Sequence, residues 1–213
     1  MSVLHEEIRN QVIEAGIMMM KNKMVVGTWG NISARVPGEE LFAITPSGVD
    51  YETIQADGIV IMDMTGKVID GLMKPSVEWP LHLAVYQDRK DIHAVVHTHS
   101  TCCTAMAIAR KPIPAAAEDL VQIVGGDVRV SEYHLPGTKE LADAAVRALK
   151  DRNGCILANH GCLAASKNLK EAMKTAEVME KSAQATIFAN MLGGVVELEQ
   201  SEVDVMRSFY LNS

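Results

Sequence analysis

Apolar residues near the start of the chain recur every three to four positions. The spacing is carried by Leu4, Ile8, Val12, Ala15 and Met19. It matches the period of an amphipathic helix and predicts one from about Val3 to Lys23. Further helices are predicted at Val77 to Gln87, Ser100 to Ala109, Thr138 to Lys150 and Asn168 to Met191, and a short helix or tail at Ser201 to Leu211. Pro75 and Ser76 favour a helix start, so Ser76 is expected near the cap of the second helix.

Short apolar runs between these helices predict strands. They are Asn31 to Val36, Leu41 to Thr45, Gly58 to Met64, His93 to His97, Cys155 to Ala158 and Cys162 to Ala165. The pair Thr65-Gly66, followed by Lys67 to Ile69, predicts a hairpin. Strands mixed with helices of this length favour a layered α/β fold, and the hairpin argues against an all-parallel sheet. Because no linker or repeat divides the chain, a single domain over residues 1–213 is predicted.

The composition argues against two classes of partner. Lys and Arg are scattered through a chain of net charge −7, so no basic stripe faces a phosphate backbone and nucleic acid is not expected. The longest uncharged segment, Ile92 to Ala109, contains three histidines that are costly in hydrocarbon, so no membrane partner is expected. No signal peptide is recognised, and four cysteines without a C-x-x-C pair fit a reduced cytoplasm.

The strongest chemical signal is His97-Thr98-His99 at the end of an apolar strand. Side chains two apart on a strand project to the same side, so the two imidazoles are expected to point together. His160 follows another apolar strand, and Glu78 is expected in the first turn of a helix. Three histidines and a carboxylate suit Zn²⁺ or a similar divalent ion with a position open to substrate, although each residue alone is also compatible with a structural role.

Three turns of small residues could bind an anion. They are Thr28-Trp29-Gly30-Asn31, Thr45-Pro46-Ser47-Gly48 and Pro75-Ser76. Each can present backbone N–H groups and hydroxyls, as phosphate-binding nests do, but taken singly each is more often only a turn.

Five segments in order resemble the class II aldolase and adducin family, most closely its L-fuculose-1-phosphate aldolase-like branch. They are Thr28 to Arg35, Ile44 to Gly48, Lys74 to Trp79, Ala94 to His99 and Asn159 to Gly161. Together they span nearly the whole chain, which makes the set far more specific than any one motif.

The resemblance implies both an architecture and a site. The fold would be three layers, α/β/α, with a nine-stranded, mainly antiparallel sheet between helices, and four subunits would form a ring with sites at their interfaces. A divalent metal, most often Zn²⁺ with Mn²⁺ or Co²⁺ as alternatives, would be bound by His97, His99 and His160, with Glu78 as a further ligand and the acid/base. The substrate phosphate would be bound by Gly30, Asn31, Ser47, Gly48 and Ser76.

The chain departs from the family pattern at two places. Val77 replaces the second serine that fuculose-phosphate aldolases carry before the glutamate, so one phosphate-binding hydroxyl is missing. The segment after Pro114 lacks the tyrosine that serves those enzymes as proton donor in a neighbouring subunit's site. The candidates to replace it are Glu118, Asp119, Tyr133 and Tyr210. His82, four residues after Glu78, either orients that carboxylate or simply packs.

The activity that the resemblance implies is that of a metal-dependent aldolase. It would cleave a ketose or deoxyketose 1-phosphate, such as L-fuculose 1-phosphate or a 5-deoxypentulose 1-phosphate, into dihydroxyacetone phosphate and an aldehyde, with Lewis-acid stabilisation of the enediolate. Methylthioribulose-1-phosphate dehydratase and pentulose-phosphate 4-epimerase activities remain alternatives. A non-catalytic adducin-like interaction module is an alternative of another class, disfavoured by the presence of Glu78 and all three histidines.

Overall fold

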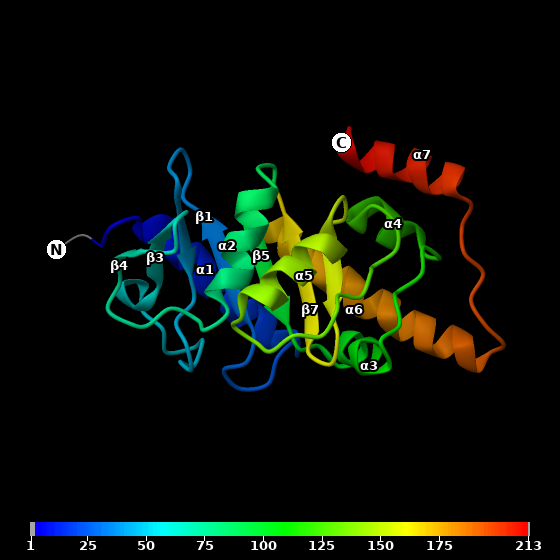
Figure 1. Cartoon of the computed structure of the whole chain (residues 1–213), viewed down its shortest axis with the longest axis horizontal. Helices are drawn as coiled ribbons and strands as arrows, with labels where there is room; N and C mark the ends of the chain where they lie inside the picture. Colours follow the sequence, from blue (N-terminus) through cyan, green and yellow to red (C-terminus); the bar gives the residue numbers. More distant parts are fainter. Residues whose placement is uncertain (1–2, 213) are drawn as a thin grey trace.

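A computed structural model describes residues 3–212, and its centre is a seven-stranded sheet (Figure 1). The strands are β1 (Asn31–Arg35), β2 (Leu41–Ile44), β3 (Val60–Asp63), β4 (Val68–Asp70), β5 (Ala94–Thr98), β6 (Gly154–Leu157) and β7 (Gly161–Ser166). Their order across the sheet is β4-β3-β2-β1-β5-β7-β6, and every neighbouring pair is antiparallel. The sheet therefore places β1 beside β5, although more than fifty residues separate them along the chain.

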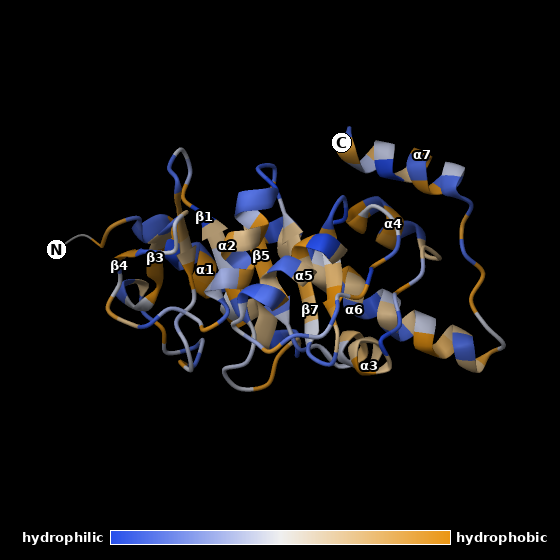
Figure 2. Cartoon of the chain, in the orientation of Figure 1, coloured by the Kyte–Doolittle hydropathy of each residue, from blue (hydrophilic) through white to orange (hydrophobic). Residues whose placement is uncertain are grey.

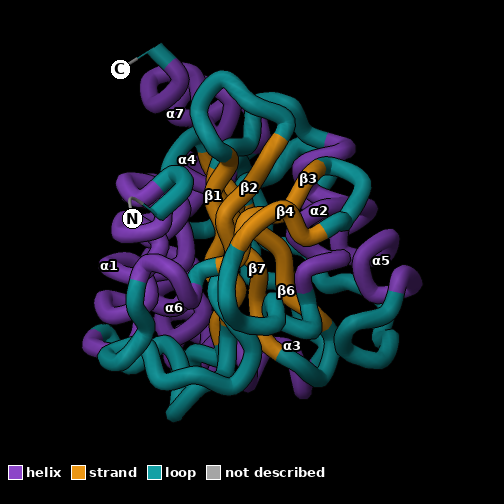
Figure 3. The backbone as a smooth tube through the Cα atoms, turned by 90° about the vertical axis from the view of Figure 1, so that its left-hand side faces the viewer, coloured by secondary structure: helices purple, strands orange, loops and turns teal. Residues whose placement is uncertain are grey.

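Helices cover both faces of this sheet, which makes three layers. They are α1 (Glu6–Lys21), α2 (Trp79–Asp88), α3 (Thr101–Ala109), α4 (Glu118–Val124), α5 (Lys139–Leu149), α6 (Leu169–Met191) and α7 (Gln200–Leu211), with a short 3₁₀ turn at Ala56–Gly58. Helices α1 and α6 lie on one side of the strands, and α2 and α5 lie on the other (Figure 3). Helix α7 packs on α4 at the end of the molecule. Within residues 3–212, no helix combines the length and the apolar character that crossing a membrane requires.

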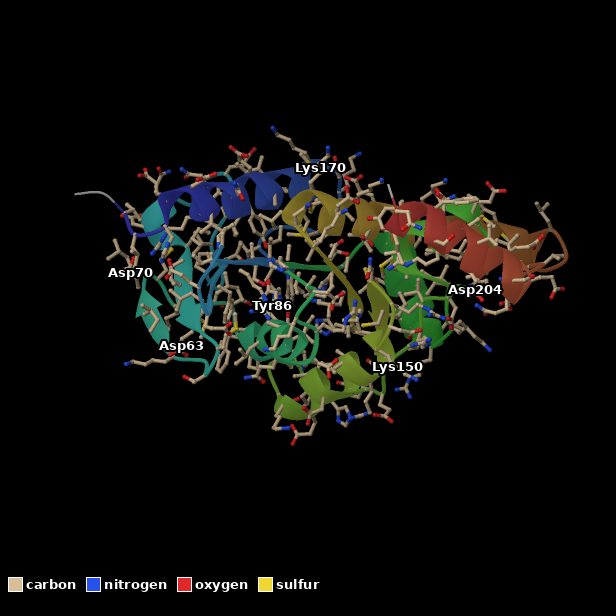
Figure 4. All side chains as sticks on the ribbon, turned by 90° about the horizontal axis from the view of Figure 1, so that it is seen from above. Asp63, Asp70, Tyr86, Lys150, Lys170 and Asp204 are labelled. Atoms are coloured by element: carbon tan, nitrogen blue, oxygen red, sulfur yellow. The ribbon has the colours of Figure 1, made fainter. Side chains whose placement is uncertain are left out.

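The two sheet faces bury two separate apolar clusters. Along β1, Ile32 and Ala34 join the cluster under α1 and α6, whereas Asn31, Ser33 and Arg35 alternate with them and face α2. All five residues of β1 are buried, because both faces are covered. The apolar sides of the helices turn inward in Figure 2, while charged residues such as Lys170 and Asp204 lie at the periphery and Tyr86 lies inside (Figure 4).

The α/β class and the mainly antiparallel sheet expected from the sequence are confirmed, but the implied count of nine strands is wrong for the described part of the chain. Residues 3–212 form seven strands and three isolated bridges. One bridge joins Pro46 to Pro75, and proline lacks the N–H that would extend a ladder from it. The others, Ile113 to Val128 and Val130 to Ile156, likewise stay single.

Two local predictions also need correction. Helix α2 begins at Trp79, with Glu78 at the N-cap and Pro80 in the first turn, where a missing N–H has no cost. Glu78 thus precedes the helix instead of lying in its first turn. Ser76 lies two residues before the N-cap, near it as expected. Helix α4 was not predicted, because its seven residues are too short for a periodic signal.

Candidate metal centre and active site

Three histidines and one glutamate converge where β5, the β6–β7 turn and the start of α2 meet. His97 is in β5 and His99 follows two residues later, so both imidazoles leave the strand on the same side. His160 is in the turn before β7, the strand that pairs with β5. Glycine is required at position 161, since a Cβ there would lie 2.3 Å from the Thr98 carbonyl oxygen. That close approach brings His160 to His97.

The nitrogen and oxygen atoms of these residues surround one point. The Nε2 atoms of His97 and His99 are 2.9 Å apart, and the three imidazole centroids are 4.7 to 4.9 Å from one another. Glu78 Oε2 lies 3.3 Å from His97 Nε2, and Oε1 lies 3.5 Å from His160 Nε2. Two nitrogens bound to one tetrahedral Zn²⁺ would be roughly 3.3 Å apart, given bonds of about 2.0–2.1 Å. The spacing therefore fits a single divalent ion.

The protonation of the histidines also fits a metal. His97 Nδ1 donates to the Cys162 carbonyl oxygen at 2.9 Å, so Nε2 is the ring nitrogen that is directed into the centre. Burial, followed by the neighbouring His97, lowers the pKa of His99 to about 3 and that of His160 to about 4. Both rings are therefore neutral near pH 7, the form in which imidazole binds a metal.

Glu78 supplies the negative charge of the site. Burial raises the pKa of its carboxyl, but His97, His160 and the hydrogen bond from Asn31 outweigh burial, so the pKa lies below its ordinary value. Oε2 accepts from Asn31 Nδ2 at 2.9 Å, whereas the buried Oε1 has no hydrogen-bond donor among the described residues. A buried carboxylate oxygen without a donor is costly, and a cation at the centre would satisfy it. The three histidines could hold such an ion, with Glu78 beside it.

The expected phosphate-binding residues lie on three adjoining loops. Ser47 N–H donates to the Lys74 carbonyl and Ser76 N–H to the Thr45 carbonyl, so the second and third loops run side by side. Ser47 and Gly48 are exposed, while Ser76 is buried and its Oγ accepts from Glu78 N–H at 3.3 Å.

The first loop ends at Gly30, whose left-handed backbone (φ +76°) lies so close to β5 that a Cβ would be 2.7 Å from the His97 carbonyl oxygen. Next to it, Asn31 is buried and uses both ends of its side-chain amide inside the protein. A cavity of about 270 Å³ lined by Val26, Trp29 and His99 opens beside this loop.

The four candidates for a second acid/base do not contact the metal centre through any described interaction. Asp119 pairs with Lys181 on α6, Glu118 is exposed in the first turn of α4, and Tyr133 is 47% exposed in a loop. Tyr210, on α7, donates to Glu171 Oε2. Each of the four therefore remains a prediction.

Two supporting residues carry no signal in the sequence. Tyr51 is buried and its hydroxyl donates to the Gly30 carbonyl at 2.8 Å, which holds the first loop. Glu180, on α6, accepts from the N–H groups of Cys102 and Cys103 at 2.8 Å and caps α3 directly after His99. Both act over long sequence separations, which local spacing does not encode.

Comparisons with known proteins agree with this geometry. A family model described as Class II Aldolase and Adducin N-terminal domain matches residues 10–187. The chain is 37% identical to a 5-deoxy-D-ribulose 1-phosphate aldolase of Bacillus thuringiensis, over 95% of this chain and 94% of that protein. It is 35% identical to an L-ribulose-5-phosphate 4-epimerase of Salmonella paratyphi B, over 86% of each. A solved L-fuculose 1-phosphate aldolase matches with a TM-score of 0.93, 38% identity and 96% coverage of both chains.

Proposed function

Since the chain belongs to the class II aldolase and adducin family, whose aldolases are metal-dependent, and is itself an enzyme, we propose that it cleaves a ketose or deoxyketose 1-phosphate. The products would be dihydroxyacetone phosphate and an aldehyde. L-fuculose 1-phosphate and 5-deoxy-D-ribulose 1-phosphate are the first substrates to test, because relatives that share more than a third of the sequence are named for them.

The observation that carries the proposal is the Glu78 carboxylate at the three histidines. Oε2 is held by Asn31, while Oε1 is buried, has no donor among the described residues and faces His160 Nε2 at 3.5 Å. In this proposal His97, His99, His160 and Glu78 bind the ion, with Zn²⁺ as first choice and Mn²⁺ or Co²⁺ as alternatives. The ion, when bound, supplies Lewis-acid stabilisation of the negative charge that develops on the substrate oxygens.

Glu78 would move the proton at C3. In the condensation direction its carboxylate removes a proton from C3 of dihydroxyacetone phosphate, and in cleavage it returns that proton once the C3–C4 bond has broken. Oε1 suits this role, because no hydrogen bond within the protein has to break first. A second group must take the C4 hydroxyl proton in cleavage, and Glu118, Asp119, Tyr133 and Tyr210 are the proposed candidates.

The substrate phosphate would lie against the three loops described above. Ser47 and Ser76 would offer their hydroxyl groups and Gly48 its backbone N–H, while Gly30 allows a close approach of the backbone. The Asn31 amide has one hydrogen left for a substrate oxygen, since its carbonyl and its other N–H are engaged by His82 and Glu78.

Product analysis tests the reaction class. Metal-loaded enzyme is incubated with L-fuculose 1-phosphate, 5-deoxy-D-ribulose 1-phosphate, 5-methylthioribulose 1-phosphate and L-ribulose 5-phosphate, and products are identified by mass and by a coupled assay for dihydroxyacetone phosphate. Release of dihydroxyacetone phosphate from any ketose 1-phosphate supports the aldolase, whereas loss of water from the methylthio sugar would indicate a dehydratase.

A 4-epimerase is the second candidate, supported by the relative of that name at 35% identity. An epimerase breaks the same C3–C4 bond but retains the aldehyde and joins it again on the other face. Conversion of L-ribulose 5-phosphate into its C4 epimer without release of dihydroxyacetone and glycolaldehyde phosphate, and with no dihydroxyacetone phosphate from any ketose 1-phosphate, would favour that activity and overturn the proposed cleavage.

A further inference from the structure

A row of buried polar side chains leads away from Glu78 between α2 and β1. Glu78, His82 and Tyr86 follow one another at four-residue intervals along α2 and its N-cap, and Asn31 and Ser33 are two apart on β1. Four residues of a helix rise about 6.0 Å and two residues of a strand about 6.6 Å, so the side chains of the two rows recur at nearly the same spacing. This match places each of the two strand side chains between two side chains of the helix row.

The contacts along the row are short and continuous. Asn31 Nδ2 lies 2.9 Å from Glu78 Oε2, Asn31 Oδ1 lies 2.5 Å from His82 Nε2, His82 Nδ1 lies 2.6 Å from Ser33 Oγ, and Ser33 Oγ lies 2.7 Å from the Tyr86 hydroxyl. His82, Ser33 and Tyr86 are fully buried, and Asn31 is only 3% exposed. Buried polar groups of this kind rigidify a site when every member is satisfied.

The hydrogen bonds of this row have one consistent direction. An ionised carboxylate only accepts, so Asn31 must turn its NH₂ group to Glu78 and its carbonyl oxygen to His82. His82 therefore carries its proton on Nε2, and in the neutral ring Nδ1 accepts from Ser33. Burial, followed by the nearby His97, lowers the pKa of His82 to about 3, in keeping with a neutral ring. Ser33 in turn accepts from the Tyr86 hydroxyl.

We propose that His82 is a positioning residue that acts on Glu78 through Asn31. The Nε2–H of His82 holds the Asn31 carbonyl oxygen, and this keeps the Asn31 amide hydrogens directed at the carboxylate and at the substrate. The inference rests on the proposed function, in which Glu78 moves the proton. His82 makes no direct hydrogen bond to Glu78 in the described structure, although the four-residue spacing on one helix suggests such a pair. Asn31, from the neighbouring strand, lies between them.

The orientation of the Asn31 amide decides whether the Glu78 carboxylate receives a hydrogen bond from it. With the NH₂ group toward Glu78, Oε2 receives a hydrogen bond and Oε1 is left for the ion or the proton. With the amide reversed, a carbonyl oxygen would face the carboxylate at the same position and repel it. The Nε2–H of His82 excludes the reversed state, because two donors would then face each other.

Two amide substitutions at position 82 separate positioning from packing. The Nε2 of a glutamine lies near the place of the imidazole Nε2 and can donate to Asn31, whereas an asparagine reaches only the place of Nδ1 and can accept from Ser33. We expect His82→Gln to keep kcat within a few-fold of the wild type. His82→Asn should lower kcat by about 10–100-fold at full metal loading, the loss that is typical when an outer hydrogen-bond partner of a metal site is removed. Metal content is measured on the same samples.

The double variant tests the path through Asn31. In an Asn31→Ala background, His82→Asn should cause little further loss of kcat, because the amide on which His82 acts is absent. Thermal unfolding of each variant measures the packing cost separately. Equal kcat values for His82→Gln and His82→Asn, or additive losses in the double variant, would reduce His82 to a packing residue.

A spectroscopic measurement is independent of turnover. ¹⁵N NMR of the metal-free wild-type protein should show His82 as the neutral Nε2–H tautomer. An Nδ1–H tautomer would reverse the Asn31 amide and overturn the inference. Failure of the proposed function looks different: the wild-type enzyme would then release no dihydroxyacetone phosphate from any substrate, while the NMR result and the wild-type fold would be unaffected.

Discussion

Replacing Glu78 with glutamine removes the carboxylate from the centre while nearly preserving its shape. In the wild-type chain Oε2 accepts from Asn31 Nδ2 at 2.9 Å, and a glutamine carbonyl can accept the same hydrogen bond. The new NH₂ group then takes the place of Oε1, 3.5 Å from His160 Nε2. It cannot accept a proton, and it can donate to the imidazole nitrogen that would otherwise bind the metal.

The size of the effect follows from these two changes. Loss of a general acid or base costs typically about 10²–10⁴-fold, so kcat should fall within that range, which is about 3–5 kcal/mol of transition-state stabilisation. Metal affinity should fall as well, because one ligand is lost and one histidine gains a competing donor. The residual rate should exceed background, since Lewis-acid stabilisation of the charge remains available.

The assay has to separate these two effects. kcat is measured with a ketose 1-phosphate that the wild type cleaves, over a titration of Zn²⁺, and metal content is determined by elemental analysis of the same samples. Glu140→Gln is the matched control, because Glu140 is an exposed carboxylate on α5 and its loss should leave kcat and metal content unchanged. A Glu78→Gln enzyme that is fully metal-loaded and turns over within a few-fold of the wild type would refute the proton-transfer role.

Four further results are expected. His99→Ala should leave a folded protein that no longer retains one metal per subunit after dialysis, and undiminished affinity by elemental analysis would show that His99 is not a ligand. Gly30→Ala should lower the free energy of unfolding by about 1–3 kcal/mol in urea titrations, since its Cβ would lie 2.7 Å from the His97 carbonyl oxygen in a left-handed backbone; unchanged stability would contradict that close approach. In the metal-free protein, buried His82 has a pKa of about 3 against 6.5 when unfolded, so the unfolded state binds more protons between these values. Stability should fall as the pH drops below 6.5, by up to about 1.4 kcal/mol per pH unit from this residue, and the slope should be shallower in His82→Gln. Light scattering should show an oligomer, with four subunits expected, and full activity as a monomer would exclude a proton donor from a neighbouring subunit.

Much of the candidate site follows from short-range patterns in the sequence. An i, i+2 pair at the end of a strand has only one geometry, so His97 and His99 point together in the structure as expected. The helix and strand positions agree with the apolar spacing to within a few residues, because that spacing reports which side of an element is buried. The family motifs then link Glu78 and His160 to the same site before any strand order is known.

The roles of Asn31 and His82 depend on the tertiary structure instead. Asn31 belongs to a motif that suggests phosphate binding, yet its carbonyl oxygen and one amide hydrogen are committed to His82 and Glu78. That commitment requires β1 to lie beside β5 and α2 to cover the same face of the sheet. Neither condition is visible in local spacing.

The sequence by itself determined the α/β class, the places of most elements and the residue types of the centre, because periodicity and motif spacing are local properties. The tertiary structure decided that the described part of the sheet has seven strands, that Glu78 stands at the N-cap of α2, and that one of its oxygens is left without a donor. The reason is physical: strand pairing and side-chain hydrogen bonding depend on which distant segments are buried against each other, and that outcome is a property of the whole packed chain.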